Sequence, residues 1–233
     1  MQAPVEVCRA EVRDEHGLDP DHRIAIGIER FDYTKGILDR MRSLDLLLEQ
    51  KPEWKGRLTF LQVAAPTRSK LASYGRLQQE AVELADEINA RHGENGYRPI
   101  RLLIRHHEPW EVFRLFRAAD LCIVSSLHDG MNLVAKEFVA SRDDDQGVLI
   151  LSSFTGASRE LSEALIVNPY DGGGMAAALD TALRMPPQEQ RERMRLMRQQ
   201  VREQNVYRWA GRMLVDAAHI RRRQRILDLA AQG

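Results

Sequence analysis

Short runs of apolar and β-branched residues recur along the chain, separated by longer stretches in which apolar and charged positions mix. Each run shows little polar alternation, which is typical of strands buried on both faces of a parallel sheet. We therefore predict strands over Arg23–Ile28, Arg57–Ala64, Ile100–Ile104, Leu121–Ser125, Val148–Leu151 and Ala164–Val167.

The stretches between these runs have the apolar spacing of helices. Met41, Leu44 and Leu48, for example, fall on one side of a helix. Helices are predicted over Ile37–Glu49, Arg68–His92, Trp110–Ala119, Met131–Ser141, Ala157–Ser162 and Met175–Met185. Because strands alternate with helices, the connections are expected to be crossovers. The sequence thus predicts an α/β fold with a doubly wound parallel sheet of about six strands.

The C-terminal part of the chain departs from this alternation. Pro186 and Pro187 end one helix. Two further helices are predicted over Gln188–Gln204 and Val206–Leu229, with no strand between them. The chain is therefore expected to form one α/β domain with a helical tail. Ligands of such sheets bind at the carboxyl ends of the strands, so functional residues are expected in the loops there.

The charge balance argues against a nucleic-acid-binding protein. The 233 residues include 34 Lys and Arg and 34 Asp and Glu, so the formal net charge is zero, whereas nucleic-acid-binding domains usually carry a basic excess. Arginines cluster in 191–198 and 221–225, but Glu189, Glu192 and Glu203 lie among or beside the first cluster. A solvated helix face is the better interpretation.

The cysteines and the apolar runs indicate the compartment. Cys8 and Cys122 have neither the spacing of a zinc site nor the number needed for a disulfide framework, which predicts the reducing cytoplasm. No apolar run approaches the roughly 18 residues of a membrane-spanning helix. The first residues lack the pattern of a secretory signal. No membrane association is expected.

The loop after the first predicted strand carries two cations. Its sequence, GIERFDYTKG over 27–36, matches neither the phosphate-binding GxxxxGK[ST] pattern nor the dinucleotide-binding GxGxxG pattern. Arg30 and Lys35 instead flank a turn that opens a helix at Gly36. Two cations at a helix N-terminus suit a phosphate or diphosphate. The alternative is a surface turn with two solvated charges.

The loop after the fourth predicted strand carries a carboxylate and a helix start. Asp129 and Gly130 form a turn, and Asp129 or Asn132 would cap the following helix. The N–H groups from Gly130 to Leu133 would then face a phosphate or a sugar oxygen. Asp129 and Glu137 together would border one cleft and accept hydrogen bonds from vicinal hydroxyls. The alternative is a capped core helix with one exposed Glu.

Two more strand ends carry charged or metal-ligating residues. Arg68 lies where the helix dipole disfavours a cation, which weakly indicates an anionic ligand. His106 and His107 follow the third strand, but no third metal ligand stands at useful spacing. We therefore interpret them as loop or pocket-wall residues and predict no metal site.

Four sequence blocks in order give the chain a resemblance to a known family. It resembles the UDP-forming trehalose-6-phosphate synthases, retaining glycosyltransferases of the two-domain GT-B fold. The blocks are GIERFDYTKG, APTR, LHDGMNLVAKEFVA and SSFTGASRELSEALIVNPYD. The resemblance covers only the C-terminal half of that family, from about Arg23 to about Ile220. It implies a Rossmann-like donor-binding domain with C-terminal helices over 21–233, the end of an interdomain connection over 1–20, and an absent N-terminal acceptor domain.

The resemblance also implies roles for the charged residues. Arg30 and Lys35 would bind the UDP diphosphate and stabilise the leaving group, and Asp129 would contact hydroxyls of the transferred glucose. These three are the implied catalytic residues. Glu137 would hold the ribose hydroxyls, and Arg68 would reach the phosphate of the acceptor sugar.

Further donor contacts are implied by the same resemblance. The loop around His106 and His107 would wall the uracil together with Val112. Backbone N–H groups would face the donor from Gly130, Met131, Asn132 and Leu133.

The implied reaction transfers glucose from UDP-glucose to glucose 6-phosphate, giving trehalose 6-phosphate and UDP. The departing phosphate would accept the proton of the incoming hydroxyl, so no protein nucleophile, metal or cofactor is expected. The implied full-length protein is a homo-oligomer, and this chain alone is expected to be inactive. Two alternatives stay open: a related glycosyltransferase that makes another compatible solute, and a shortened, inactive module that binds a nucleotide sugar.

Overall fold

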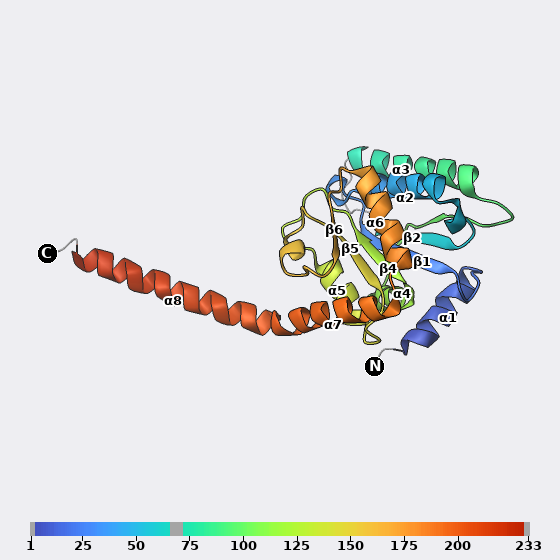
Figure 1. The fold of residues 1–233 in the computed structure, drawn as a ribbon. Helices are drawn as coiled ribbons and strands as arrows, with labels where there is room; N and C mark the ends of the chain where they lie inside the picture. Colours follow the sequence, from blue (N-terminus) through green and yellow to red (C-terminus); the bar gives the residue numbers. More distant parts are fainter. Residues whose placement is uncertain (1–2, 66–71, 231–233) are drawn as a thin grey trace.

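The computed structural model describes residues 3–65 and 72–230. Six strands form one fully parallel sheet in the order β3-β2-β1-β4-β5-β6 (Figure 1). The direction of the winding changes between β1 and β4, as in doubly wound sheets. The predicted α/β fold is thereby confirmed. The strands are β1 Arg23–Arg30, β2 Leu58–Ala65, β3 Ile100–Leu103, β4 Leu121–Val124, β5 Val148–Ser152 and β6 Leu165–Val167.

Helices cover both faces of the sheet (Figure 1). On one face, α2 (Ile37–Gln50) packs between α3 (Ala72–His92) and α6 (Gly172–Arg184). The other face is covered by α1 Val5–Glu15, α4 Pro109–Ala118, α5 Leu133–Ser141 and α7 Pro187–Glu203.

Alternate residues of the central strands enter opposite layers of the core. In β1, Ile24 and Ile26 pack under α4 and α5, while Ala25 faces α2 and α3. In β2, Leu61 packs in the same layer as Ile24 and Ile26, and Phe60 packs in the same layer as Ala25. Because both faces of these strands are buried, both alternating sets must be apolar, which explains the uninterrupted apolar runs.

One helix was not predicted, and one predicted helix needs correction. Residues 1–20 contain the unpredicted helix α1, whose apolar side is buried at Val5, Cys8 and Val12; that this region is the end of an interdomain connection stays a prediction. The helix predicted over Ala157–Ser162 is only the 3-10 turn Gly156–Arg159. That segment follows the end of β5 closely, so it connects two strands without room for a longer helix.

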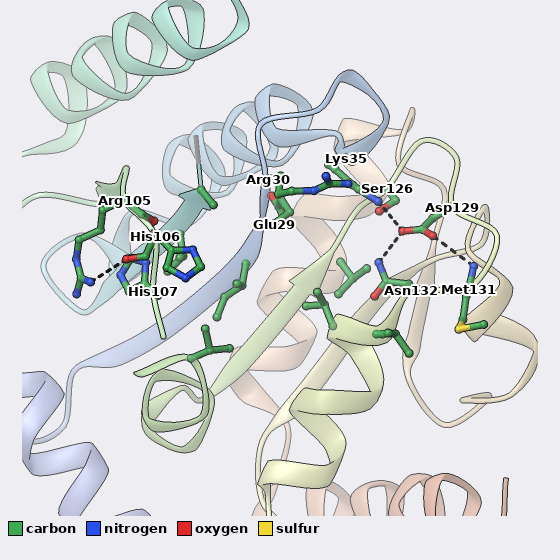
Figure 2. Close-up of a pocket in the computed structure, with 17 residues that line it drawn as sticks. Glu29, Arg30, Lys35, Arg105, His106, His107, Ser126, Asp129, Met131 and Asn132 are labelled. Carbon is green, nitrogen blue, oxygen red and sulfur yellow. Dashed lines mark hydrogen bonds and ion pairs between the residues drawn. The ribbon is translucent and has the colours of Figure 1, made fainter. Parts of the chain in front are cut away.

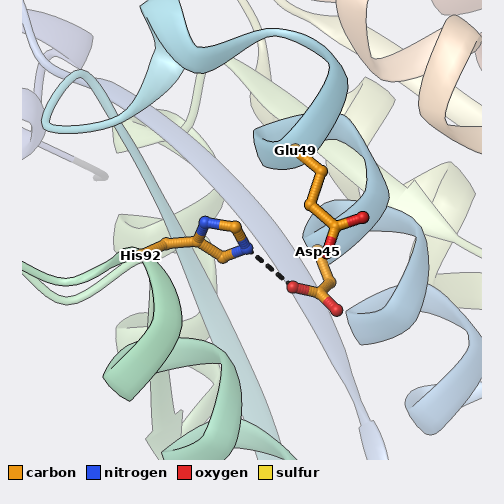
Figure 3. Close-up of side chains that lie close together, drawn as sticks. All are labelled: Asp45, Glu49 and His92. Carbon is orange, nitrogen blue, oxygen red and sulfur yellow. Dashed lines mark hydrogen bonds and ion pairs between the residues drawn. The ribbon is translucent and has the colours of Figure 1, made fainter.

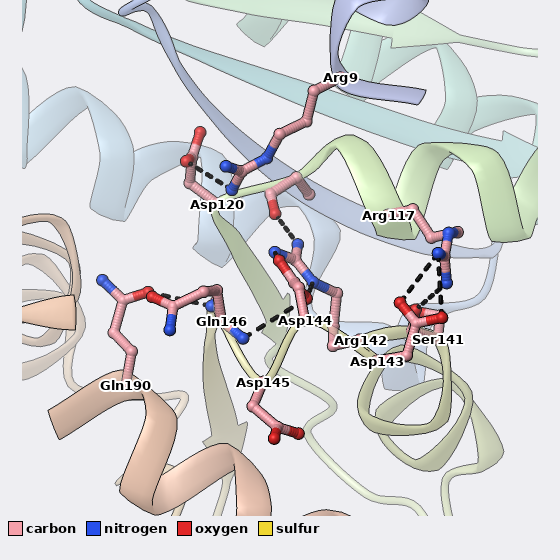
Figure 4. A network of polar contacts seen from close by, with 12 residues as sticks. Arg9, Arg117, Asp120, Ser141, Arg142, Asp143, Asp144, Asp145, Gln146 and Gln190 are labelled. Atoms are coloured by element: carbon pink, nitrogen blue, oxygen red, sulfur yellow. Dashed lines mark hydrogen bonds and ion pairs between the residues drawn. The ribbon is translucent and has the colours of Figure 1, made fainter. Parts of the chain in front are cut away.

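A polar network ties α1 and the loop after α5 to the amino-terminal edge of the sheet (Figure 4). Asp120, just before β4, accepts hydrogen bonds from Arg9, Arg13 and the N–H group of Ile24. Arg142, which is fully buried, donates to the carbonyl oxygens of Phe116 and Ala119 and pairs with Asp144. These bonds fix α1 and the loop after α5 against the amino-terminal edge of the sheet.

The last helix, α8 (Val206–Ala230), extends away from the rest of the molecule (Figure 1). Asn205 caps it, because its Oδ1 accepts from the N–H groups of Tyr207 and Arg208. The predicted tail of two helices is confirmed. None of the helices in the described part of the chain is both long and apolar enough to cross a membrane. The large apolar side chains exposed on α8 are Val206, Tyr207, Trp209, Met213, Leu214, Val215 and Ile220.

Candidate functional site

A cavity of about 870 Å³ opens at the carboxyl ends of β1, β2 and β4, where the winding of the sheet changes direction. Nine residues singled out from the sequence line it, from loops far apart in the chain. They are Arg30, Lys35, His106, His107, Val112, Asp129, Met131, Asn132 and Leu133. The structure therefore brings most of the predicted donor site together (Figure 2).

Two described residues of the predicted site, Gly130 and Glu137, are not part of the cavity wall. A third predicted residue, Arg68, lies outside the described residues. Gly130 points its carbonyl oxygen toward Gly156 and does not line the cavity. Glu137 is half-buried in α5, one turn beyond the cavity-lining residues Leu133 and Val134. Since residues three and four apart share a helix side, it faces the rim of the cavity.

The β1–α2 turn carries two cations, Arg30 and Lys35, that differ in their polar contacts. Asp32 Oδ1 accepts from the N–H and hydroxyl groups of Thr34, at 2.9 and 2.8 Å, and so opens the 3-10 turn Tyr33–Lys35. Lys35 Nζ lies 2.7 Å from Asp129 Oδ2. Arg30 is exposed, and no hydrogen bond or ion pair joins its side chain to another described residue. One cation of the turn is therefore held by a carboxylate and the other is available to a ligand.

The conformation of this turn depends on Gly36. Its φ of 63° lies in the left-handed region, which side-chain-bearing residues rarely adopt. A Cβ atom here would also overlap the carbonyl oxygen of Ser125 at the end of β4. Gly36 thus lets the turn approach β4 closely, which places Lys35 opposite Asp129.

Asp129 is held by three donors at the cavity. Besides Lys35, Asn132 Nδ2 donates to its Oδ2 at 3.1 Å, and the Met131 N–H group donates to its Oδ1 at 3.3 Å. Its own backbone bonds to Phe154 and Gly156, at 3.2 and 2.9 Å. Burial tends to raise the pKa of Asp129, but these hydrogen bonds outweigh burial and lower the pKa below its usual value. Asp129 is therefore a carboxylate at neutral pH.

Asn132 sets the start of α5. Its side-chain Oδ1 accepts from the Ala135 N–H group at 2.9 Å, so Asn132, not Asp129, is the N-cap. The helix therefore begins at Leu133, two residues later than predicted. The Met131 N–H group, expected to face the ligand, instead bonds Asp129 in this structure. The unpaired donors of the first helical turn begin with Leu133 and Val134.

The opposite end of the cavity is formed by the loop after β3 (Figure 2). His107 is buried, and its Nδ1 lies 3.1 Å from the carbonyl oxygen of Arg105. Burial lowers the pKa of His107 below its usual value, so the ring is neutral at pH 7. His106 is largely exposed, and Val112 completes the wall from α4. Arg105, on the same loop, pairs with Glu111 at 2.8 Å, so its charge is balanced there. The neutral ring of His107 and the side chain of Val112 form a surface that suits a planar heterocycle.

The sequence analysis missed several lining residues. Arg105 and Ser126 stand at strand ends and carried the same positional signal as the residues that were found. Glu29 lies inside the GIERFDYTKG block, but no pattern along the chain marks it as buried. Burial raises the pKa of Glu29, although the Arg40 guanidinium opposes this effect. The apolar floor comes from Ile28, Val63, Ala65, Val124 and Val134.

A second cluster has the side chains of a metal site but already holds a cation (Figure 3). Asp45, Glu49 and His92 place ligand atoms within 4.8 Å of one another, between α2 and the end of α3. His92 Nε2 lies 2.7 Å from Asp45 Oδ1. Arg91 Nη1 lies 2.6 Å from Asp45 Oδ2 and 3.2 Å from Glu49 Oε1. The guanidinium therefore neutralises both carboxylates, and the cluster ties two helices together.

Comparison with known proteins gives a consistent set of similarities. The model of glycosyltransferase family 20 matches residues 2–219. The trehalose-6-phosphate synthase of Klebsiella pneumoniae is 41% identical over 194 residues, which are 83% of this chain and 41% of that protein. The relatives compared here are thus longer than this chain.

Solved structures repeat the fold at similar identity. The alpha,alpha-trehalose-phosphate synthase (UDP-forming) from Burkholderia xenovorans in complex with glucose-6-phosphate superposes with a TM-score of 0.84 at 37% identity, over 91% of this chain and 48% of that one. The E. coli trehalose-6-phosphate protein bound with UDP-2-fluoro glucose gives 0.85 at 34% identity, over 93% and 47%. The chain therefore spans less than half the length of each of these three proteins.

Proposed function

The chain belongs to glycosyltransferase family 20, and we propose that it is the donor-binding half of a trehalose-6-phosphate synthase. In this proposal the complete protein transfers glucose from UDP-glucose to glucose 6-phosphate and releases trehalose 6-phosphate and UDP. The similar structures bound with UDP-2-fluoro glucose and with glucose-6-phosphate support these two substrates.

The observation that carries the proposal is the arrangement of three charges beyond the carboxyl ends of β1 and β4. Arg30 is exposed at the cavity, and Lys35 lies beside it on the same turn, paired with Asp129 at 2.7 Å. Two cations at the start of a helix form a site for a diphosphate. When a diphosphate binds, Lys35 would turn toward it, and Asp129 would gain capacity to accept from sugar hydroxyls.

The proposed chemistry needs charge stabilisation more than a protein nucleophile. The bond between the glucose anomeric carbon and the UDP oxygen breaks, and a bond to the acceptor hydroxyl oxygen forms. The acceptor's proton passes to the departing diphosphate. Negative charge grows on that diphosphate, where Arg30 and Lys35 would stabilise it. A contact of this kind is worth roughly 3–4 kcal/mol in the transition state.

The remaining contacts of the proposed donor follow from the cavity wall. The uracil would lie against His107 and Val112, whose surface carries no charge at neutral pH. The N–H groups of Leu133 and Val134, in the first turn of α5, would face donor oxygens. Glu137 at the rim is proposed for the ribose hydroxyls, and Arg68 for the acceptor phosphate.

Calorimetric titration of this chain with UDP, GDP and ADP tests the proposal. We expect saturable UDP binding that persists in the presence of a chelator, because two cations and helix N–H groups supply the charge. Arg30→Ala and Lys35→Ala should abolish or strongly weaken it. Arg42→Ala is the matched control, because Arg42 is an exposed arginine on α2 that does not line the cavity.

Either of two results would contradict the proposal. One is no binding of any of the three nucleotides to the folded chain. The other is UDP binding that Arg30→Ala leaves unchanged. An acceptor panel on a protein that also contains the other half would separate trehalose 6-phosphate synthesis from synthesis of another solute.

A further inference from the structure

An arginine is completely buried beneath the proposed donor site. Arg40, on the first turn of α2, is fully inaccessible to solvent, as is Arg142 at the opposite edge of the sheet. Burying a guanidinium costs several kcal/mol unless its donors find partners. What Arg40 binds therefore indicates why it is there.

All the polar contacts of Arg40 go to the strands and the turn that build the cavity. Its Nε donates to Ser125 Oγ at 2.9 Å, at the end of β4. Its Nη2 donates to the carbonyl oxygen of Lys35 at 3.1 Å and lies 2.9 Å from Glu29 Oε1. Its Nη1 donates to Glu29 Oε2 at 3.2 Å and to Gln62 Oε1 at 3.3 Å. One planar group thus joins β1, β2, β4 and the β1–α2 turn.

The chain leaves room for this guanidinium and surrounds it with partners. A Cβ atom at Gly27 of β1 would overlap Arg40 Nη1, so the glycine makes the space. Gln62 is fully buried in β2, and its Nε2 donates to Glu29 Oε1 at 3.0 Å and to the Gly27 carbonyl oxygen at 3.3 Å. The network is satisfied on every side, which makes its geometry specific.

The network also connects the two loops that carry the charges of the site. Ser125 Oγ, which accepts from Arg40, donates to the carbonyl oxygen of Gly36 at 3.0 Å. A little further along, the Leu127 N–H group donates to the carbonyl oxygen of Thr34 at 2.7 Å. The backbone that bears Lys35 is thereby held against the backbone that leads to Asp129.

We propose that Arg40 is a positioning residue for donor binding. It holds the β1–α2 turn against the end of β4 and so sets the distance between Lys35 and Asp129. This inference rests on the proposed function, because the donor diphosphate is the ligand that this distance serves. Arg40 itself is closed off from the cavity and acts through Lys35.

The first test is Arg40→Lys measured by calorimetric titration with UDP. The lysine keeps a positive charge beside Glu29, so no carboxylate is left buried alone. It cannot reach Ser125, Glu29 and the Lys35 carbonyl together, because it lacks the planar fork. We expect UDP binding to weaken about tenfold or more, since the turn loses its tie to β4.

Arg142→Lys is the matched control. Arg142 is as buried as Arg40, also donates to backbone carbonyl oxygens and also pairs with a carboxylate, but at the far edge of the sheet. Arg142→Lys should lower the midpoint of thermal unfolding at least as much as Arg40→Lys does. It should leave UDP affinity within about twofold of the wild type, since distant sites act independently.

A double-mutant cycle with Lys35→Ala separates positioning from general stabilisation. If Arg40 acts through Lys35, Arg40→Lys should weaken residual UDP binding much less in the Lys35→Ala background than in the wild type. Equal fold-losses in both backgrounds, or an unchanged affinity in Arg40→Lys, would overturn the inference. If Arg40→Lys does not fold, Ser125→Ala, which removes the bonds of Ser125 Oγ to Arg40 Nε and to the Gly36 carbonyl oxygen, replaces it in the same cycle.

A measurement without nucleotide keeps this inference distinct from the proposed function. The Leu127 amide reports contact between the two loops, so its hydrogen exchange should accelerate in Arg40→Lys but not in Arg142→Lys. Equal protection of Leu127 in the two variants would overturn the inference even if UDP binds. A wild-type chain that binds no UDP would instead overturn the proposed function, and the Leu127 amide would still decide the role of Arg40.

Discussion

The ion pair between Lys35 and Asp129 leaves both side chains partly accessible at the cavity, at 22% and 17% exposure. In the proposed function a diphosphate would compete for Lys35, while Asp129 would keep its bonds from Asn132 and Met131. The pair therefore positions two charged side chains at the cavity without closing it.

The pH dependence of stability should reveal the state of Asp129. Its pKa is lowered in the folded protein, so the ionised form contributes stability above the unfolded pKa of about 3.9. That contribution is lost as the pH falls through the folded pKa. We expect the wild type to exceed Asp129→Asn in urea-unfolding free energy at pH 6–7, with the gap closing at acid pH. A gap that stays constant down to pH 3 would contradict this account.

Two glycines with nearly the same φ allow the cost of backbone strain to be measured apart from the cost of steric overlap. Gly36 has φ 63° and Gly17 has φ 59°, but only at Gly36 would a Cβ meet other atoms. Gly17→Ala should cost about 1–2 kcal/mol for the left-handed conformation alone. Gly36→Ala should cost clearly more and weaken UDP binding, because the turn must move away from Ser125. Urea unfolding of both variants checks this, and equal losses would mean that the turn accommodates the methyl group.

At the scale of elements, the loops of the site are joined to helix starts and strand ends by short side-chain bonds. α5 begins where Asn132 caps it, and the same side chain donates to Asp129. The β1–α2 turn begins with the Asp32 side chain bonding Thr34. Because these bonds are local, the loops take their shape from their own sequence, while the network around Arg40 sets the distance between them.

The cap of α5 gives a prediction with an internal control. Asn132 has a φ of 71°, which glycine adopts readily and alanine does not. Asn132→Ala should lose about 1 kcal/mol for the cap and a further amount for the backbone conformation. Asn132→Gly loses the cap bond but not the conformation, so it should be the more stable variant by thermal unfolding. A glycine variant that is less stable than the alanine variant would show that the backbone conformation matters little here.

At the scale of the whole molecule, the residues proposed for the donor come from this chain, which spans less than half the length of the relatives described above. In the proposed function, the acceptor is held mainly by the other half of the complete protein. The helix α8 leaves the body with its apolar side chains exposed. Donor binding and turnover should therefore separate experimentally.

The isolated chain should bind UDP but release no UDP from UDP-glucose and glucose 6-phosphate above the background rate. The physical reason is that transfer needs an acceptor held in line and water excluded, and in the proposed function both depend on the acceptor half. A coupled assay of UDP release checks this, with a protein that includes the acceptor half as the positive control. Turnover by this chain alone would contradict it.

Much of the fold and of the site could be predicted along the chain. The six strands and most helices appear as runs and periodicities, and the cations and carboxylate appear at strand ends. The helix α1 was missed because its three buried apolar residues are spaced among charges. Glu29 and Arg40 were missed because a charged residue carries no mark of burial until the elements around it are assembled.

The sequence by itself determined the alternation of buried strands with helices and the charges that stand at the strand ends, because these depend on neighbours along the chain. Only the structure decided which of Asp129 and Asn132 caps α5, that Lys35 pairs with Asp129, and that Arg40 joins three strands. Such contacts bridge up to 94 positions of sequence. Their energies depend on distance and burial in the folded protein, which no local pattern contains.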